Sequence, residues 1–376
     1  DSQVTTKLRL PETADPAGAR LELHIAPSVA GALIQAVSGL AGYPYGCVEQ
    51  TMSRFGPTLS AARAFRELKL PTDSLPKDLD KMVAQGVDRL VGFQHADGGW
   101  GWWKEDATHP YMSAYALWGL WQAKREGRPV DDAVLERGRT AVERQLEASL
   151  AAGKDEDAGS SYGAGAGGPA IRAFMFFVLS HMPPVPGAYN ALAERMLADA
   201  ARMKPQARAL YALALSNLGL AERAGEEAKR LMSGAERAGG MARWEGASFD
   251  HGWQADNIQT TAAALRAVLA AAPADGARGA LAVEAVQGLL HQRRDSGWAS
   301  TQDTAAAAYA LVDYLKTAPP KAGSAVLTAR FNGGELRTVG LGDGAVPQTL
   351  VFKGARVAEN GVDLTLTGGA DAFYTA

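Results

Sequence analysis

The helical periodicity in the middle of this chain constrains its fold more than any other feature. Between about residues 28 and 317, apolar side chains return every three or four positions, as at Val83, Val87 and Leu90. This spacing places them on one face of an α-helix. Gly and Pro signals divide the stretch into roughly twelve helical runs of ordinary length. These runs pair into about six helical hairpins, so we expect a mainly α fold.

Three short loops indicate that the hairpins close into a ring. Residues 94–103, 244–259 and 292–302 each combine Trp with Gly and lead into a helix rich in small residues, which is typical of a repeated hairpin corner. We expect an α/α toroid. In each loop, the Trp that follows Gly should be buried in the core with its N–H satisfied. These residues are Trp100, Trp253 and Trp298.

Both ends of the chain alternate between apolar and polar residues as β-strands do. A small β portion at each end of a helical middle is typical of an inserted domain, because the ends of an insertion usually lie close together. We therefore predict β-strands of a host domain in residues 1–27, the helical toroid in residues 28–318, and returning strands of the host in residues 319–376. The alternative is two strand segments that pack separately on the helical body.

Charge and residue usage exclude several functions. A formal net charge of -3 gives no strong field to attract nucleic acid or an anionic membrane. Apolar stretches are too short to cross a bilayer, so we expect no membrane insertion by this segment. The six histidines show no metal-ligand spacing, and the Gly-rich residues 163–168 lack the Lys of a phosphate-binding loop. We expect no metal and no nucleotide cofactor.

Cys47 is the only cysteine, which excludes an internal disulfide and leaves a buried thiol, an intermolecular link or a reactive group. A Gly and Pro turn precedes it, so a helix should begin at or near Cys47. Helical N–H groups and the positive end of the helix dipole favour a thiolate. We therefore predict a lowered thiol pKa and a reactive sulfur.

The spacing of Cys47 and Gln50 permits a specific reaction. Residues three apart lie on one face of a helix, so the thiol can meet the carboxamide, displace ammonia and close an internal thioester. A thioester is an acyl donor that water would destroy, so it needs an apolar cover. Four neighbouring side chains are suited to provide this cover: Tyr43, Tyr45, Met52 and Phe55.

The run Gly46-Cys47-Val48-Glu49-Gln50, preceded by Tyr43-Pro44-Tyr45, resembles the thioester signature of the alpha-2-macroglobulin and complement superfamily, and its flanks resemble the bacterial branch. Residues 300–304, with the sequence Ser-Thr-Gln-Asp-Thr before an Ala-rich helix, resemble a late segment of the same thioester domain. The resemblance implies a helical toroid inserted into a small, CUB-like β domain. The strands at both ends of this chain would belong to that host.

The resemblance implies a protease-trapping inhibitor with a single-use thioester rather than an enzyme. In this family, cleavage of a bait segment exposes the thioester, which captures a Lys amine of the attacking protease. Bacterial relatives are periplasmic, often lipid-anchored to the inner membrane, and guard the cell against foreign proteases. The chain begins at Asp1 and lacks a bait segment and the surrounding β domains, so we expect a part of such a protein that does not inhibit alone.

Site roles follow from the same resemblance. It implies that Cys47 and Gln50 form the bond, that Glu49 orients the turn, and that Tyr43 shields the thioester. Gly46 and Tyr45 complete the matching motif.

A downstream position selects the nucleophile in the family. Some complement members use a His there to direct attack toward hydroxyls, and the best-matching residues here, 155–162, contain none. We align Ser161 or Tyr162 with that position, which predicts a preference for amines.

Other functions remain open from the residues alone. Cys47 could be an inert buried thiol. Residues 94–103 and 292–298 resemble the Gln and Trp repeats of terpene-cyclase toroids. Those enzymes use clustered aspartates as a proton donor. The acidic run 155–157 is followed by Ala and Gly and does not form such a cluster. A non-covalent protein-binding module could use the concave face. An α/α glycoside hydrolase would need two facing carboxylates, for which no spacing selects a pair among Asp97, Glu105, Asp106, Glu245 and Asp250.

Overall fold

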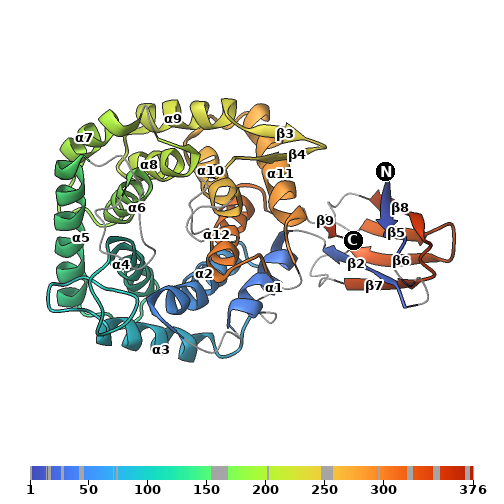
Figure 1. The fold of residues 1–376 in the computed structure, drawn as a ribbon, viewed down its shortest axis with the longest axis horizontal. Coiled ribbons are helices and arrows are strands. Elements are labelled where there is room, and N and C mark those ends of the chain that lie inside the picture. The colour runs from blue at the N-terminus through green and yellow to red at the C-terminus, as the bar shows by residue number, and fades with distance from the viewer. Residues whose placement is uncertain are drawn as a thin grey trace.

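The computed structural model describes residues 2–13, 15, 18–26, 29–41, 46–70, 72, 75–153, 168–200, 203–246, 257–294, 297–319, 325–341, 348–368 and 373–375. Twelve helices and nine strands lie within these residues. The helices form two concentric rings, and most strands form a separate body beside them (Figure 1). The prediction of a mainly α toroid with strands from both ends of the chain is confirmed.

Six helices form the inner ring. Each contacts the next, and the last packs against the first, so the ring is closed. Small residues allow this close approach: a Cβ added at Gly119 would clash with the side chain of Met52 on the neighbouring helix. The inner helices are α2 (Val48–Glu67), α4 (Pro110–Arg125), α6 (Pro169–Leu179), α8 (Pro205–Asn217), α10 (Asn257–Ala271) and α12 (Thr301–Thr317).

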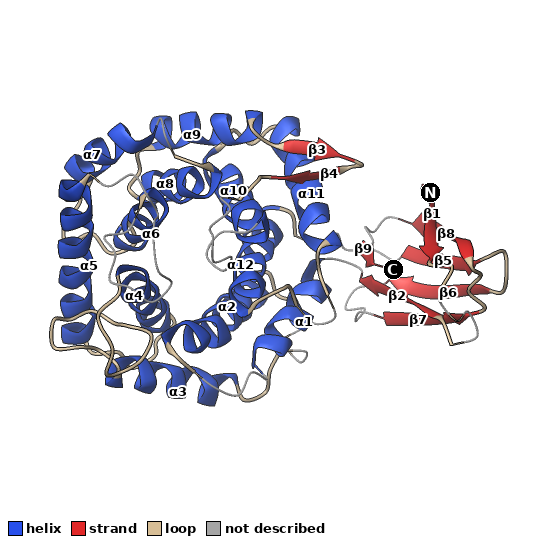
Figure 2. Cartoon of the chain, in the orientation of Figure 1, coloured by secondary structure: helices blue, strands red, loops and turns tan. Residues whose placement is uncertain are grey.

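The other six helices surround this ring (Figure 2). Several of them are amphipathic, as the sequence predicted: in α3, Val83, Val87 and Leu90 are buried. The outer helices are α1 (Val29–Ala41), α3 (Leu79–Gly92), α5 (Asp132–Ala152), α7 (Asn190–Ala200), α9 (Ala221–Ser233) and α11 (Gly276–His291). Among the described helices, none has the length and apolar character of a membrane span.

Local signals set where many helices begin. Pro stands at the start of α4, α6 and α8, where its missing N–H costs no helical hydrogen bond. Side-chain oxygens cap three others by accepting a backbone N–H. These caps are Asp131 before α5, Asp275 before α11 and Ser300 before α12.

Three Trp residues occupy equivalent corners of the toroid. In each corner, the indole N–H donates to a carbonyl of the preceding outer helix, and the Trp backbone N–H donates to a hydroxyl of the following inner helix. The indole nitrogens of Trp100, Trp244 and Trp298 lie 2.7, 2.7 and 2.8 Å from the carbonyl oxygens of Leu90, Leu231 and Leu289.

The buried positions predicted for Trp100 and Trp298 are therefore confirmed, with their N–H groups satisfied. In the middle loop, Trp244 takes the equivalent place. Trp253, which we had expected there, lies outside the described residues.

Strands from the two ends of the chain pair with each other. One antiparallel sheet has the order β1 (Ser2–Leu10), β8 (Ala358–Gly368), β5 (Ala325–Phe331) and β6 (Leu336–Leu341). The second has the order β7 (Gln348–Lys353), β2 (Arg20–Ala26) and β9 (Phe373–Thr375). This pairing excludes two strand segments that pack separately on the helical body.

The two sheets share one apolar cluster that includes Leu23, Ile25, Leu327 and Phe331. Their assignment to a host domain into which the toroid is inserted stays a prediction. A third, two-stranded sheet, β3 (Glu236–Ala238) with β4 (Met241–Arg243), belongs to the helical body and packs β4 on α11.

Candidate functional site

Cys47 lies directly before the first turn of α2, where the sequence predicted a helix to begin. Its backbone is extended, and its side chain is a free thiol that is only 6% exposed. Two contacts hold this turn: the Val48 N–H donates to the carbonyl of Trp102 over 2.9 Å, and the Arg89 guanidinium donates to the carbonyl of Gly46 over 2.8 Å. The turn is thereby fixed to α3 and to the first Trp-containing corner.

Gly46 is required by a close approach inside the turn. A Cβ at this position would lie 2.6 Å from Oγ1 of Thr51 and 3.3 Å from the Thr51 backbone nitrogen. Any side chain here would push the turn away from the first residues of α2. The Gly of the motif therefore has a steric cause.

The environment of the thiol differs from the prediction. Burial raises the pKa of Cys47 above its ordinary value, and the nearby charge of Glu49 adds to the rise. The backbone N–H groups of Gln50 and Glu49 favour the thiolate, as expected at a helix start, but their effect is smaller. The predicted lowering of the thiol pKa is therefore wrong, because loss of hydration outweighs the helix N-terminus.

Gln50 lies in the same first turn and is less buried than Cys47. Its side chain lines an open cavity of about 680 Å³ between α2 and α3. Three cationic side chains and one carboxylate also line this cavity: Arg54, Arg89, Lys104 and Asp88. Gln50 thus borders an accessible space with several cationic side chains around it, whereas Cys47 is buried.

Glu49 connects this turn to a distant part of the chain. Its side chain is 7% exposed, and its Oε1 accepts hydrogen bonds from the Ser53 hydroxyl at 2.6 Å and the Thr301 hydroxyl at 3.0 Å. The Ser53 oxygen also lies 3.2 Å from the hydroxyl of Tyr115 on α4. Burial raises the pKa of Glu49, and the charge of Asp303 adds to the rise.

The structure therefore brings residues 300–304 next to the Cys47–Gln50 turn. These are the two segments that carried the family resemblance in the sequence. Sequence reasoning missed Ser53 and Tyr115, because their contacts depend on how the inner ring closes. It also missed Trp102, although this residue lies in the predicted corner 94–103.

Four predicted site residues lie outside the described residues: Tyr43, Tyr45, Ser161 and Tyr162. Met52 and Phe55, expected to cover the pair, are both 0% exposed and belong to the core of the ring. Phe55 packs against Gly86 of α3 and also lines the cavity beside Gln50. Met52 fills the space next to α4, so its role is in the core rather than in a cover.

Two acidic residues nominated for a hydrolase have structural partners. Asp97 accepts hydrogen bonds from the Gly99 N–H and the Thr108 hydroxyl, each at 3.0 Å. Asp106 accepts from the backbone N–H of Trp102 at 2.8 Å and so shapes the same corner. No group of three or more potential metal ligands occurs among the residues described. These contacts favour a structural role for both acids.

Comparison with known proteins identifies similar sequences. The family model of the A-macroglobulin TED domain matches residues 23–145 and 180–314, more than half of the chain. The alpha-2-macroglobulin of Thermotoga maritima is 39% identical over 99 residues, which are 26% of this chain and 6% of that protein. The chain thus spans only a small part of the length of this relative.

Solved structures share the fold. The structure of Salmonella alpha-2-macroglobulin reacted with methylamine has a TM-score of 0.59 and 20% identity, covering 98% of this chain and 24% of that chain. The structure of Escherichia coli alpha-2-macroglobulin activated by porcine elastase has a TM-score of 0.55 and 19% identity, covering 98% and 32%. At this identity the likeness establishes the fold alone.

Proposed function

This chain belongs to the A-macroglobulin family as a TED domain of the bacterial alpha-2-macroglobulin type, and on that premise we propose that Cys47 and Gln50 form an internal thioester. Cys47 Sγ attacks Gln50 Cδ, the bond from Cδ to Nε2 breaks, and the nitrogen leaves as ammonia with the thiol proton. The pair needs no separate catalyst, because the first turn of α2 holds both groups at a high effective concentration.

One observation supports this proposal most. A buried thiol and a cavity-lining carboxamide lie three residues apart at the start of one helix. In the thioester, the sulfur would be protected from water while the acyl carbon stays next to the space from which a nucleophile arrives. The burial that raises the thiol pKa also makes the thiolate a poorer leaving group, which slows premature hydrolysis.

The thioester would then acylate an amine. A neutral primary amine attacks Gln50 Cδ, an amide bond forms, the bond to Cys47 Sγ breaks, and a proton from the amine restores the thiol. The methylamine named for the Salmonella structure is such an amine. In the whole protein, we propose that bait cleavage by a protease exposes the bond and that a Lys of the protease is captured.

The protein as a whole would therefore be a single-use inhibitor rather than an enzyme. The E. coli relative activated by porcine elastase supports a protease trigger. The periplasm, with an anchor in the inner membrane, stays our predicted location for the whole protein. A preference of the thioester for amines over hydroxyls also stays a prediction. A comparison of methylamine with glycerol as acyl acceptors would test it.

The intact mass of the denatured chain tests the thioester directly. We expect a mass one ammonia below the calculated value and a blocked thiol, followed by addition of one methylamine as one thiol appears. Cys47→Ala should show the full mass of its sequence and no methylamine addition. A free thiol with an unchanged Gln50 would contradict the proposal, whereas Gln50 found as Glu would indicate a bond that formed and was hydrolysed.

Protease capture needs the whole protein. Incubation with trypsin should give a covalent complex that survives denaturation and that contains a Gln50 to Lys cross-link by mass spectrometry. Prior methylamine treatment and Cys47→Ala should each abolish this complex. A complex that survives both treatments would contradict thioester capture without contradicting thioester formation.

A further inference from the structure

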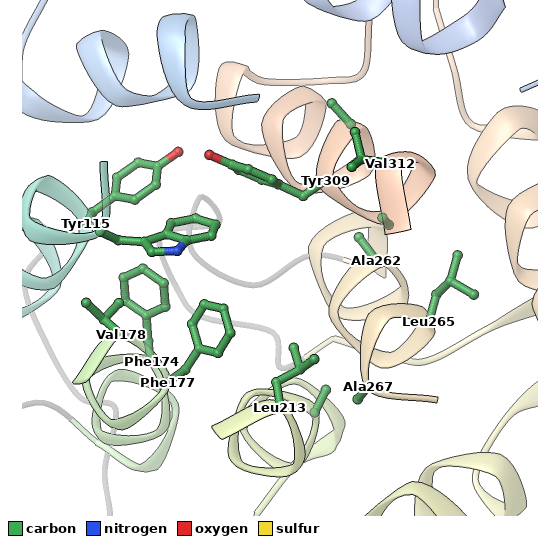
Figure 3. Packing of buried hydrophobic residues seen from close by; sticks show 14 of the residues in the cluster. Tyr115, Phe174, Phe177, Val178, Leu213, Ala262, Leu265, Ala267, Tyr309 and Val312 are labelled. Carbon is green, nitrogen blue, oxygen red and sulfur yellow. The ribbon is translucent and has the colours of Figure 1, made fainter. Parts of the chain in front are cut away.

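A second cavity lies at the centre of the inner ring, with a volume of about 100 Å³. Residues of α4, α6, α8, α10 and α12 line it, and Figure 3 shows Tyr115, Phe174, Phe177 and Tyr309 gathered from three of these helices. The rings contact one another closely: the centroids of Trp118 and Tyr309 are 4.6 Å apart. Aromatic side chains from α4, α6 and α12 therefore form part of the wall, and a flat apolar group would fit against them.

One polar side chain in this wall has no hydrogen-bond partner within the described part of the chain. Gln302, in the first turn of α12, lines the cavity and is 7% exposed. Neither its Oε1 nor its Nε2 has a hydrogen-bond partner among the described residues. Buried amide atoms without partners are rare and destabilising. By contrast, the neighbouring Gln259 donates to Asp303 over 2.8 Å.

Charges on two sides of the cavity favour an uncharged occupant. Arg266 lines one side, 5.9 Å from the ring centre of Trp118, and forms an ion pair with Asp313 at 2.7 Å. A second cation against these rings would be repelled by Arg266. Near the Gln302 end, burial raises the pKa of Tyr111, and the negative charges of Glu49 and Asp303 add to the rise. An anion is therefore disfavoured there.

We propose that this cavity binds a small, uncharged carboxamide with a single ring or a short apolar tail. Its C=O would accept from Gln302 Nε2 and its N–H would donate to Gln302 Oε1, so that both unpartnered atoms are satisfied by one group. The tail would lie against Tyr111, Trp118 and Phe174. The cavity, at about 100 Å³, is smaller than an engineered apolar cavity of about 150 Å³ that holds benzene in another protein. It would therefore enclose the carboxamide end of the ligand, and part of a single ring would extend toward the open side of the cavity.

Benzamide is the probe, and its binding to the whole chain can be measured by titration calorimetry or ligand-observed NMR. We expect saturable binding that Gln302→Leu weakens about tenfold, as loss of paired hydrogen bonds predicts. Toluene lacks the amide, so its binding should be the same in wild type and Gln302→Leu. Gln287→Leu, on the exposed side of α11, is the matched control and should leave benzamide binding unchanged.

A second pair of variants fills the cavity. Ala306→Phe from α12 and Ala263→Leu from α10 should each abolish benzamide binding, and circular dichroism identifies a variant that fails to fold. Benzoate and benzylamine should bind more weakly than benzamide. The proposal is overturned if wild type shows no saturable binding, if Gln302→Leu binds benzamide as wild type does, or if a folded filling variant still binds it.

Discussion

The hydroxyl of Thr301 donates to the Glu49 carboxylate over 3.0 Å and joins the first turns of α12 and α2. These residues are 252 positions apart, and their helices are the last and the first of the inner ring. The contact therefore closes the toroid at the same place where the proposed thioester forms. It explains why two segments at opposite ends of the helical sequence carry one signature.

Removal of the hydrogen bond between Thr301 and Glu49 should destabilise the packing of α12 on α2. Thr301→Val keeps the shape of the side chain but leaves a buried carboxylate with one donor fewer, so we expect a loss of about 1–3 kcal/mol in the free energy of unfolding. Urea unfolding measures it. Thr301→Ser keeps the hydroxyl and should lose clearly less, and equal losses in both variants would show that the hydrogen bond is not the cause.

Stability should depend on pH through Glu49. Its pKa is raised in the folded chain because the carboxyl is buried, so the folded state holds the proton more strongly than the unfolded state. Folding is therefore favoured below the unfolded pKa of about 4.3 and loses stability as pH rises through the higher folded pKa.

The variant Glu49→Gln tests this sign. The amide oxygen can still accept from Ser53 and Thr301, because both donate to the same atom, Oε1. We expect wild type to lose stability relative to Glu49→Gln as pH rises from about 4, below the unfolded pKa, to about 8, in urea unfolding curves taken across this range. A difference that stays constant, or one that favours wild type at higher pH, would contradict a raised pKa.

Much of the toroid could be predicted because its signals are local. Apolar periodicity marks the helices, and Pro or capping residues mark many of their starts. The hairpin of β3 and β4 was missed because its strands have three residues each, and all three residues of β3 are exposed. Such short, polar strands carry no period that a sequence can reveal.

The candidate site also has features that local sequence predicts and features that depend on the closed ring. The spacing of Cys47 and Gln50 is a property of one helix and could be read directly. The hydrogen bonds of Glu49 to Ser53 and Thr301, and the burial that governs the thiol pKa, arise only when the ring closes. The helix N-terminus suggested the opposite pKa shift because local sequence contains no measure of lost hydration.

The free thiol should accordingly react slowly. In Gln50→Asn, the shorter amide should not reach the sulfur, so Cys47 stays free and its alkylation by iodoacetamide can be followed against pH. An ordinary cysteine has a pKa of about 8.5. We expect the alkylation rate of Cys47 to reach half its maximum at a higher pH than this, because burial opposes the thiolate. The urea-unfolded variant is the control and should titrate normally. A midpoint below the unfolded value would mean that the helix N-terminus outweighs burial.

Gly46→Ala should distort the turn that presents Cys47. The new Cβ would lie 2.6 Å from Thr51 Oγ1, so either the turn or Thr51 must move, at a cost of about 1–3 kcal/mol in stability. We also expect less thioester, measured as methylamine incorporated per chain. Thr51→Ala removes the clashing oxygen, so the double variant should recover part of both losses, with the 3.3 Å approach to the Thr51 backbone nitrogen limiting the recovery. If the double variant is no better than Gly46→Ala, the clash with the Thr51 side chain is not what requires glycine at this position.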